Sequence, residues 1–169
     1  MSRIRRIAAP GGVFFFTVVT HRRLPVFTDE TRVEAFREAI RTVRKHRPFV
    51  IDAMVVMPEH LHCIWRLPPG DGDHSARWRE IKKRTARALA PMLGVSRIWQ
   101  PRYWDHLIRD EDDWRRHVDY VHYNPVRHGH ASRAAEWPWS SFSWAVARGW
   151  YAPGWGSVEP DHVRDMHFE

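Results

Sequence analysis

The 169-residue chain contains a single cysteine, Cys63, which excludes an internal disulfide, a CxxC pair and a multi-cysteine zinc site. It also lacks any apolar run near the ~20 residues that a membrane-spanning helix needs. The first ten residues are basic but have neither the apolar core nor the cleavage site of a signal peptide. We therefore expect a soluble cytoplasmic protein with no membrane partner.

Basic and aromatic residues, by contrast, are abundant. Lys and Arg number 27 against 20 Asp and Glu, which gives a formal charge of +7, and there are ten tryptophans. The length fits one domain, and a hydrophobic content of 43% is typical of a globular core. This composition is typical of a surface that binds phosphates and unpaired bases, but a basic protein with a large aromatic core would share it.

The hydrophobic pattern predicts an α+β fold. Runs of β-branched and aromatic residues predict strands at residues 13–20, 49–57 and 60–67, with a short strand within 98–108. Apolar residues at helical spacing predict helices over residues 28–46, 75–89 and about 112–123. Two residues join the middle strands, which is too few for a parallel crossover. We expect a ferredoxin-like antiparallel sheet with helices packed on one face.

Two histidines form the first candidate site. His60 and His62 lie at positions i and i+2 of a predicted strand, so both imidazoles point from the same face. They could share one cation or one phosphate, or they could be two histidines on a sheet surface without a ligand. Cys63 is expected in the core on the other face, and Glu59, in the strand connection, is expected to point away from the histidines.

The second candidate lies on the predicted helix 112–123. His117, Tyr120 and Asn124 fall at i, i+3 and i+7 and so share one stripe, with Asn124 in the last turn or just beyond because Pro125 follows. A tyrosine hydroxyl with a pKa of about 10 is a poor nucleophile until a cation or base favours its phenolate. A metal held by the histidine pair nearby would polarise a phosphodiester for such an attack.

Basic residues are concentrated in two segments. The helix at 75–89 carries one acid, Glu80, against six basic residues: Arg77, Arg79, Lys82, Lys83, Arg84 and Arg87. The first segment of the chain has no acid before Asp29 and contains Arg3, Arg5 and Arg6. We interpret both as contacts to nucleic-acid phosphates; the alternatives are a solvated helix face and a disordered terminus.

Aromatic and acidic residues of the later chain raise two further hypotheses. Stacking platforms for unpaired bases are expected among Trp99, Tyr103, Trp104, Trp137 and Trp139, with only one or two in use. Residues 159–169 carry four acids against Arg164, so this tail could lie over the basic groove and limit access to DNA. The alternative is a solvated end.

Several strings resemble the REP-associated tyrosine transposases, relatives of the single-tyrosine transposases of the HUH nuclease class. The resemblance covers about residues 11–142, and we assign residues 1–142 to this domain and 143–169 to a C-terminal extension. The strings that carry it include Val55-Val-Met-Pro-Glu-His-Leu-His-Cys-Ile-Trp65, Trp104-Asp-His-Leu-Ile-Arg109, His117-Val-Asp-Tyr-Val-His-Tyr-Asn-Pro-Val-Arg-His-Gly129 and Trp137-Pro-Trp-Ser-Ser-Phe142.

The resemblance implies the HUH nuclease fold and a specific chemistry. His60, His62 and Asn124 would hold a divalent metal, Mg²⁺ or Mn²⁺. Many insertion-sequence relatives have glutamine at the position of Asn124. Tyr120 would be the nucleophile that forms a 5′-phosphotyrosine link and frees a 3′-hydroxyl. The implied substrate is single-stranded DNA folded as a REP-type hairpin, handled by a nucleoid-associated enzyme that acts as a monomer or a dimer.

Two other functions remain open on the sequence. A non-catalytic binder of DNA hairpins would carry the same residues without turnover. An RNA-binding ferredoxin-like module is disfavoured because the central strands lack the aromatic RNP-type pattern and carry two histidines instead.

Overall fold

The computed structural model describes residues 9–169, and within them one four-stranded antiparallel sheet has the strand order β2-β3-β1-β4. The strands are β1 (Val13–Val19), β2 (Val50–Val56), β3 (His60–Arg66) and β4 (Trp104–Leu107). The long helices are α1 (Glu30–His46), α2 (His74–Leu93) and α3 (Glu111–Arg127). Shorter helical segments are η1 (His21–Arg23), η2 (Ala134–Glu136), α4 (Phe142–Ala147) and α5 (Asp161–Arg164). The order β1-α1-β2-β3-α2-β4 confirms the predicted ferredoxin-like sheet.

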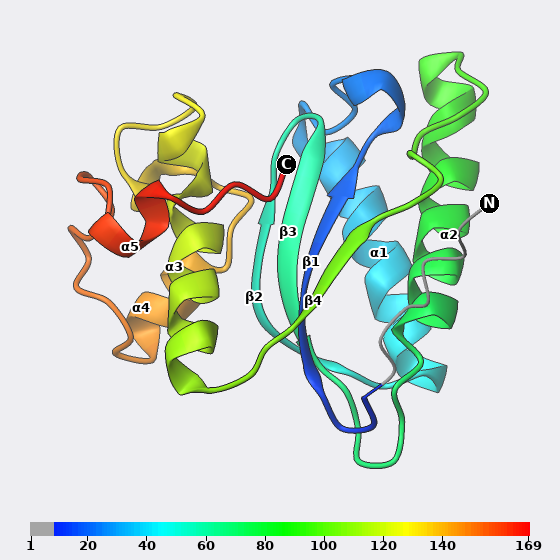
Figure 1. Ribbon diagram of the computed structural model, residues 1–169. Coiled ribbons are helices and arrows are strands. Elements are labelled where there is room, and N and C mark those ends of the chain that lie inside the picture. Colours follow the sequence, from blue (N-terminus) through cyan, green and yellow to red (C-terminus); the bar gives the residue numbers. More distant parts are fainter. Residues whose placement is uncertain (1–8) are drawn as a thin grey trace.

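Helices cover both faces of the sheet: α1 and α2 lie on one, and α3 with the C-terminal segment lies on the other (Figure 1). The expectation that all helices share one face is therefore wrong for α3. The physical reason lies in β1, where Phe14, Phe15 and Phe16 are all fully buried although successive side chains point to opposite faces. A strand that is apolar on both sides requires a cover on both sides.

Each long helix begins after an aspartate whose carboxylate accepts a hydrogen bond from a backbone N–H of the first turn; these are Asp29, Asp73 and Asp110. Helix α3 ends at Arg127 rather than at the expected residue 123. Asn124 therefore lies in the last turn of α3, which is one of the two positions expected for it; the other was just beyond the helix. The helix continues past Pro125 because the His128 N–H still bonds the Asn124 carbonyl at 3.1 Å and the turn is buried.

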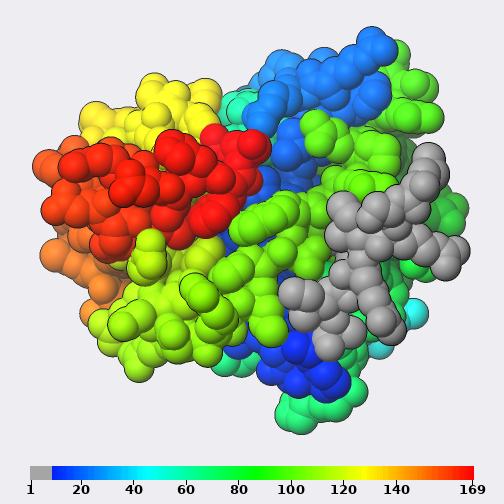
Figure 2. All heavy atoms as spheres, viewed as in Figure 1, coloured from blue at the N-terminus to red at the C-terminus, as the bar shows by residue number. Residues whose placement is uncertain are grey.

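The C-terminal segment packs onto α3. Val163 and Met166 are buried in the same apolar cluster as Tyr120, and α4 spans the predicted boundary after residue 142. The chain end then returns to the sheet near β3 and β1 (Figure 1), and its atoms form part of the surface in this view (Figure 2). Helix α2 lies on the opposite face, so the hypothesis that the acidic tail covers the basic helix is wrong. Within residues 9–169 we find no helix with the length and apolar character needed to cross a bilayer.

Candidate active site

His60 and His62 point from β3 toward α3 and meet the helix stripe there. The two rings are fully buried, with centroids 4.9 Å apart. His60 Nε2 lies 3.1 Å from Asn124 Oδ1. The Tyr120 ring lies 5.1 Å from the His62 ring. The strand period of two and the helical stripe thus bring all four side chains to one place.

The outer nitrogens of both histidines have fixed partners. His62 Nδ1 lies 2.9 Å from Thr17 Oγ1, and His60 Nδ1 lies 3.0 Å from Glu59 Oε1. The expectation that Glu59 points away is wrong, because this residue precedes β3 and the strand alternation does not constrain its side chain. Thr17 was missed, since its role depends on the β1–β3 register that pairs it with His62. Such outer contacts orient histidines that bind a metal through the other nitrogen.

The remaining nitrogen of His62 marks the centre of the site. Nε2 is buried and has no hydrogen-bond partner within residues 9–169. Burial lowers the pKa of His62 to about 4, so the imidazole is neutral near pH 7, which is the form that binds metals. An unpaired neutral imidazole, a second imidazole backed by a carboxylate, and an amide oxygen are a donor set that fits a divalent cation.

Glu169, the last residue, reaches into this centre. Its Oε1 accepts hydrogen bonds from Tyr120 Oη at 2.7 Å and from Asn124 Nδ2 at 3.1 Å. The same oxygen lies 2.9 Å from His128 Nε2 and 3.6 Å from His62 Nε2. His60, His62 and Glu169 also form a group whose ligand atoms lie close enough to hold a metal ion. Sequence reasoning missed this residue, because nothing local to position 169 links it to β3.

Burial raises the pKa of Tyr120 above its usual range, and the hydrogen bond to Glu169 raises it further. Burial alone would raise the pKa of the Glu169 carboxyl. The nearby His128 and His62 rings and the hydrogen bonds from Tyr120 and Asn124 outweigh burial and hold this pKa below its usual value. The tyrosine is therefore a neutral phenol that donates to a carboxylate. It needs a nearby cation to become a phenolate.

The tail that carries Glu169 is anchored upstream. Arg127 donates to the Val163 carbonyl at 3.1 Å and contacts His167 Nδ1 at 2.8 Å. Asp119, by contrast, lies next to Tyr120 in the sequence but contacts Tyr151 and His162 and faces away from the site.

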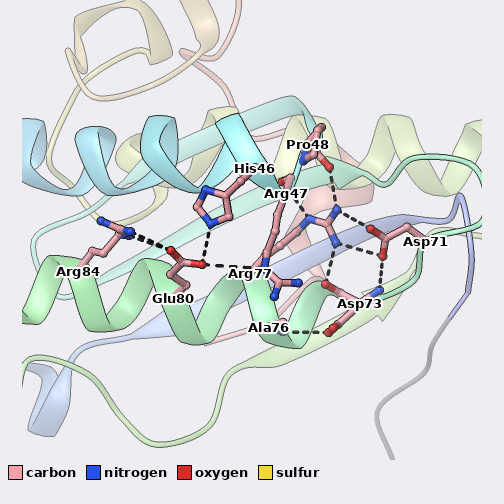
Figure 3. Close-up of polar contacts among 9 residues, drawn as sticks. All are labelled: His46, Arg47, Pro48, Asp71, Asp73, Ala76, Arg77, Glu80 and Arg84. Atoms are coloured by element: carbon pink, nitrogen blue, oxygen red, sulfur yellow. Dashed lines mark hydrogen bonds and ion pairs between the residues drawn. The ribbon is translucent and has the colours of Figure 1, made fainter.

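Arg77 is not available to DNA, and its predicted phosphate contact is wrong. Its side chain is only 1% exposed, and its guanidinium donates to the Asp71 carboxylate at 2.7 Å and to the Pro48 carbonyl at 2.8 Å (Figure 3). It also donates to the carbonyls of Asp73 and Arg47. The residue therefore joins the loop before α2 to the loop after α1.

The other predicted basic contacts on α2 differ in exposure. Lys82 is half-buried, with Nζ 2.6 Å from the Gln100 carbonyl. Arg84 is exposed and bonds Glu80. The exposed basic residues of this helix, called the α2 basic face below, are Arg79, Lys83, Arg84 and Arg87. Arg3, Arg5 and Arg6 lie outside the described residues.

The candidate stacking residues also separate by burial. Trp99 is 7% exposed in the core, and the indole N–H groups of Trp137 and Trp139 bond Val56 and Glu30. Trp104, at the start of the edge strand β4, remains 43% exposed.

Comparison with known proteins identifies the family. The profile described as "Transposase IS200 like" matches residues 14–124. The chain is 49% identical over 162 residues to the REP-associated tyrosine transposase of Escherichia coli (strain K12), covering 95% of this chain and 94% of the relative. The chain belongs to the REP-associated tyrosine transposases. A Haemophilus influenzae protein named as a candidate REP-associated tyrosine transposase is 35% identical over 171 residues, covering 95% and 96%.

Solved structures agree with this membership. A REP-associated tyrosine transposase bound to a REP hairpin matches with a TM-score of 0.84 at 45% identity, covering 99% of both chains. A protein described as a candidate transposase from Deinococcus radiodurans matches with a TM-score of 0.50 at 17% identity, covering 78% of this chain and 98% of that one; it shares the fold alone. The chain thus has the HUH fold of the REP-associated tyrosine transposases.

Proposed function

We propose that this chain is a metal-dependent endonuclease and strand transferase that acts on single-stranded DNA folded as REP-type hairpins. The observation that carries the proposal is the convergence of Tyr120 with His60, His62 and Asn124 around a buried imidazole nitrogen of His62 that has no hydrogen-bond partner within residues 9–169. The hairpin bound by the relative of solved structure supports the substrate class.

His60, His62 and Asn124 would hold the divalent cation. When bound, Mg²⁺ or Mn²⁺ would withdraw charge from the scissile phosphate, and imidazole ligation favours Mn²⁺. Glu59 and Thr17 keep the two imidazoles oriented toward that position. Glu169 must leave before a phosphate can enter, because both are anions that need the same donors.

Tyr120 then acts as the nucleophile. Its phenolic oxygen bonds to the scissile phosphorus, the bond from phosphorus to the 3′ oxygen breaks, and the phenol proton is lost as the leaving 3′ oxygen gains one. The products are a 5′-phosphotyrosine and a free 3′-hydroxyl. No ATP is needed, because the phosphotyrosine conserves the phosphodiester energy and a 3′-hydroxyl can reverse the step.

The α2 basic face supplies phosphate contacts to the paired stem. Since α2 and α3 lie on opposite faces of the sheet (Figure 1), a hairpin held by α2 must send its unpaired strand around the β4 edge to reach Tyr120. An enzyme with this substrate would work at the nucleoid.

The proposal is tested by incubating the purified full-length chain with single-stranded palindromes from its own genome and Mn²⁺, Mg²⁺ or a chelator. We expect a metal-dependent covalent adduct that peptide mapping assigns to Tyr120. Tyr120→Phe should abolish the adduct, whereas Tyr123→Phe should retain it, because Tyr123 lies on the same helix but packs against Trp155. An adduct with Tyr120→Phe would overturn the assignment.

A non-catalytic hairpin binder is the second candidate, favoured by the Glu169 carboxylate that occupies the Tyr120 site. It predicts hairpin affinity that is indifferent to metal and to Tyr120→Phe, and no adduct even after residues 168–169 are removed.

A further inference from the structure

The side chain next to Glu169 occupies a second position that the proposed chemistry does not use. The Phe168 ring lies nearly parallel to the Trp104 ring, at 4.9 Å and 13°, and nearly parallel to the His117 ring, at 5.3 Å and 15°. Phe15 and Tyr120 contact it at 5.4 Å and 5.1 Å with tilted or edge-on rings. We call the space bounded by these four residues the aromatic slot.

The slot has the properties of a stacking site for a flat ligand. Trp104 is still 43% exposed with Phe168 on it, although a large apolar side chain on an edge strand would gain from more cover. His117 is held in place by its Nδ1, 2.7 Å from the Asp113 carbonyl, and its ring also stacks on His106 at 4.7 Å. The His117 wall is therefore fixed by the fold, independently of the tail.

The slot adjoins the anion position directly. The Tyr120 ring forms one wall of the slot, while its hydroxyl donates to Glu169. The Glu169 carboxylate in turn is surrounded by donors from Tyr120, Asn124 and His128, which is the environment of a phosphate oxygen. Two consecutive residues thus present a planar ring and an anion in the arrangement that one nucleotide presents with its base and its phosphate.

We propose that the aromatic slot of Trp104 and His117 binds the unpaired base of a nucleotide adjacent to the scissile phosphate, and that Phe168–Glu169 occupies the slot as a nucleotide mimic. This inference rests on the proposed function for the identity of the phosphate. Stacking on these rings recognises any base and reads little sequence, since every base has a π-face. Its effect is to hold the strand so that the phosphate meets Tyr120.

The test combines a DNA lesion with a protein variant and reads binding rather than cleavage. A hairpin with an unpaired extension receives a single abasic site, moved one position at a time, and its affinity is measured by fluorescence anisotropy without metal. The background is full-length protein with Phe168→Ala, which empties the slot. We expect one abasic position to weaken binding by roughly tenfold. Adding Trp104→Leu should remove that loss, while Trp104→Phe, which keeps an aromatic face, should preserve it.

Trp144→Leu is the matched control, because Trp144 is similarly exposed, at 41%, but lies on α4 and contacts Arg148 and Trp150. It should leave the abasic effect intact. An abasic effect of equal size in the Trp104→Leu protein, or at no position at all, overturns the slot. Melting curves verify that each variant is folded.

The two proposals fail separately. If the abasic effect depends on Trp104 but no adduct forms with metal, the slot stands and the nuclease proposal is wrong. If the adduct forms and the abasic effect ignores Trp104, only the slot is wrong.

Discussion

Two arginines of α2 differ in burial and therefore in role. Arg77 places all of its guanidinium nitrogens on acceptors of the loops around α2, whereas Arg87, ten residues later on the same helix, is exposed. A buried cation that loses its acceptors costs several kcal/mol, but an exposed one costs little. The first residue therefore stabilises the fold, and the second is free to contact phosphates.

Arg77→Met should lower the free energy of unfolding by about 2–4 kcal/mol, because the stem is kept while Asp71 and three carbonyls lose their donor. Urea unfolding measures this. Arg87→Met, as the control, should leave unfolding within about 0.5 kcal/mol and weaken hairpin binding. A stable Arg77→Met protein that binds DNA poorly would instead show that Arg77 contacts DNA.

At the scale of elements, the ion pair between Asp71 and Arg77 holds the connection from β3 to α2. Hydrogen bonds donated by Arg77, and one from the Asp73 backbone N–H, lower the pKa of Asp71 to about 2. The pKa in the folded protein is thus below the unfolded value, so Asp71 contributes stability above about pH 4. That contribution is lost as the pH falls toward 2.

Asp71→Asn should accordingly reduce the melting temperature at pH 7 by an amount that corresponds to about 1 kcal/mol, since Asp71 is partly solvated. The difference between wild type and variant should shrink as the pH falls from 4 to 2. Calorimetry over this range checks it. A difference in melting temperature that stays constant down to pH 2 would mean that the charge of Asp71 does not produce the stabilisation.

On the scale of the whole molecule, the two faces of the sheet carry different functional groups. Helix α2, with its exposed basic residues, lies over one face, and α3 with the C-terminal segment lies over the other (Figure 1). On that second face His62 and Tyr120 meet Glu169. Under the proposed function, substrate would displace Phe168 and Glu169 while Val163 and Met166 keep the tail anchored to α3. Residues 168–169 would then compete with the DNA for this site.

Removing residues 168–169 should raise the initial rate of adduct formation at least about tenfold, which is the equivalent of one charge-assisted hydrogen bond. The anchoring residues remain, so the melting temperature should change little. Glu159→Gln is the control, since this tail acid contacts Arg164 and lies outside the site. Equal rates with and without the two residues would mean that the tail leaves the site at no cost.

The candidate site was only partly predictable. His60 with His62 and Tyr120 with Asn124 could be paired in advance because alternation along a strand and spacing along a helix are local properties of the backbone. The contact of Thr17 with His62 could not be predicted, because it depends on the register between β1 and β3.

The sequence by itself determined the four strands and the three long helices, the shared face of the two histidines, the helix stripe and, through its strings, the family. Only the tertiary structure decided that Arg77 is buried, that α3 covers the second face of the sheet, and that Glu169 enters the site. Periodicity acts over a few residues and is legible in the chain. Contacts between distant segments depend on the path of the chain. They depend also on which polar groups lose their water on burial and then need a protein partner, so they form only when the whole molecule folds.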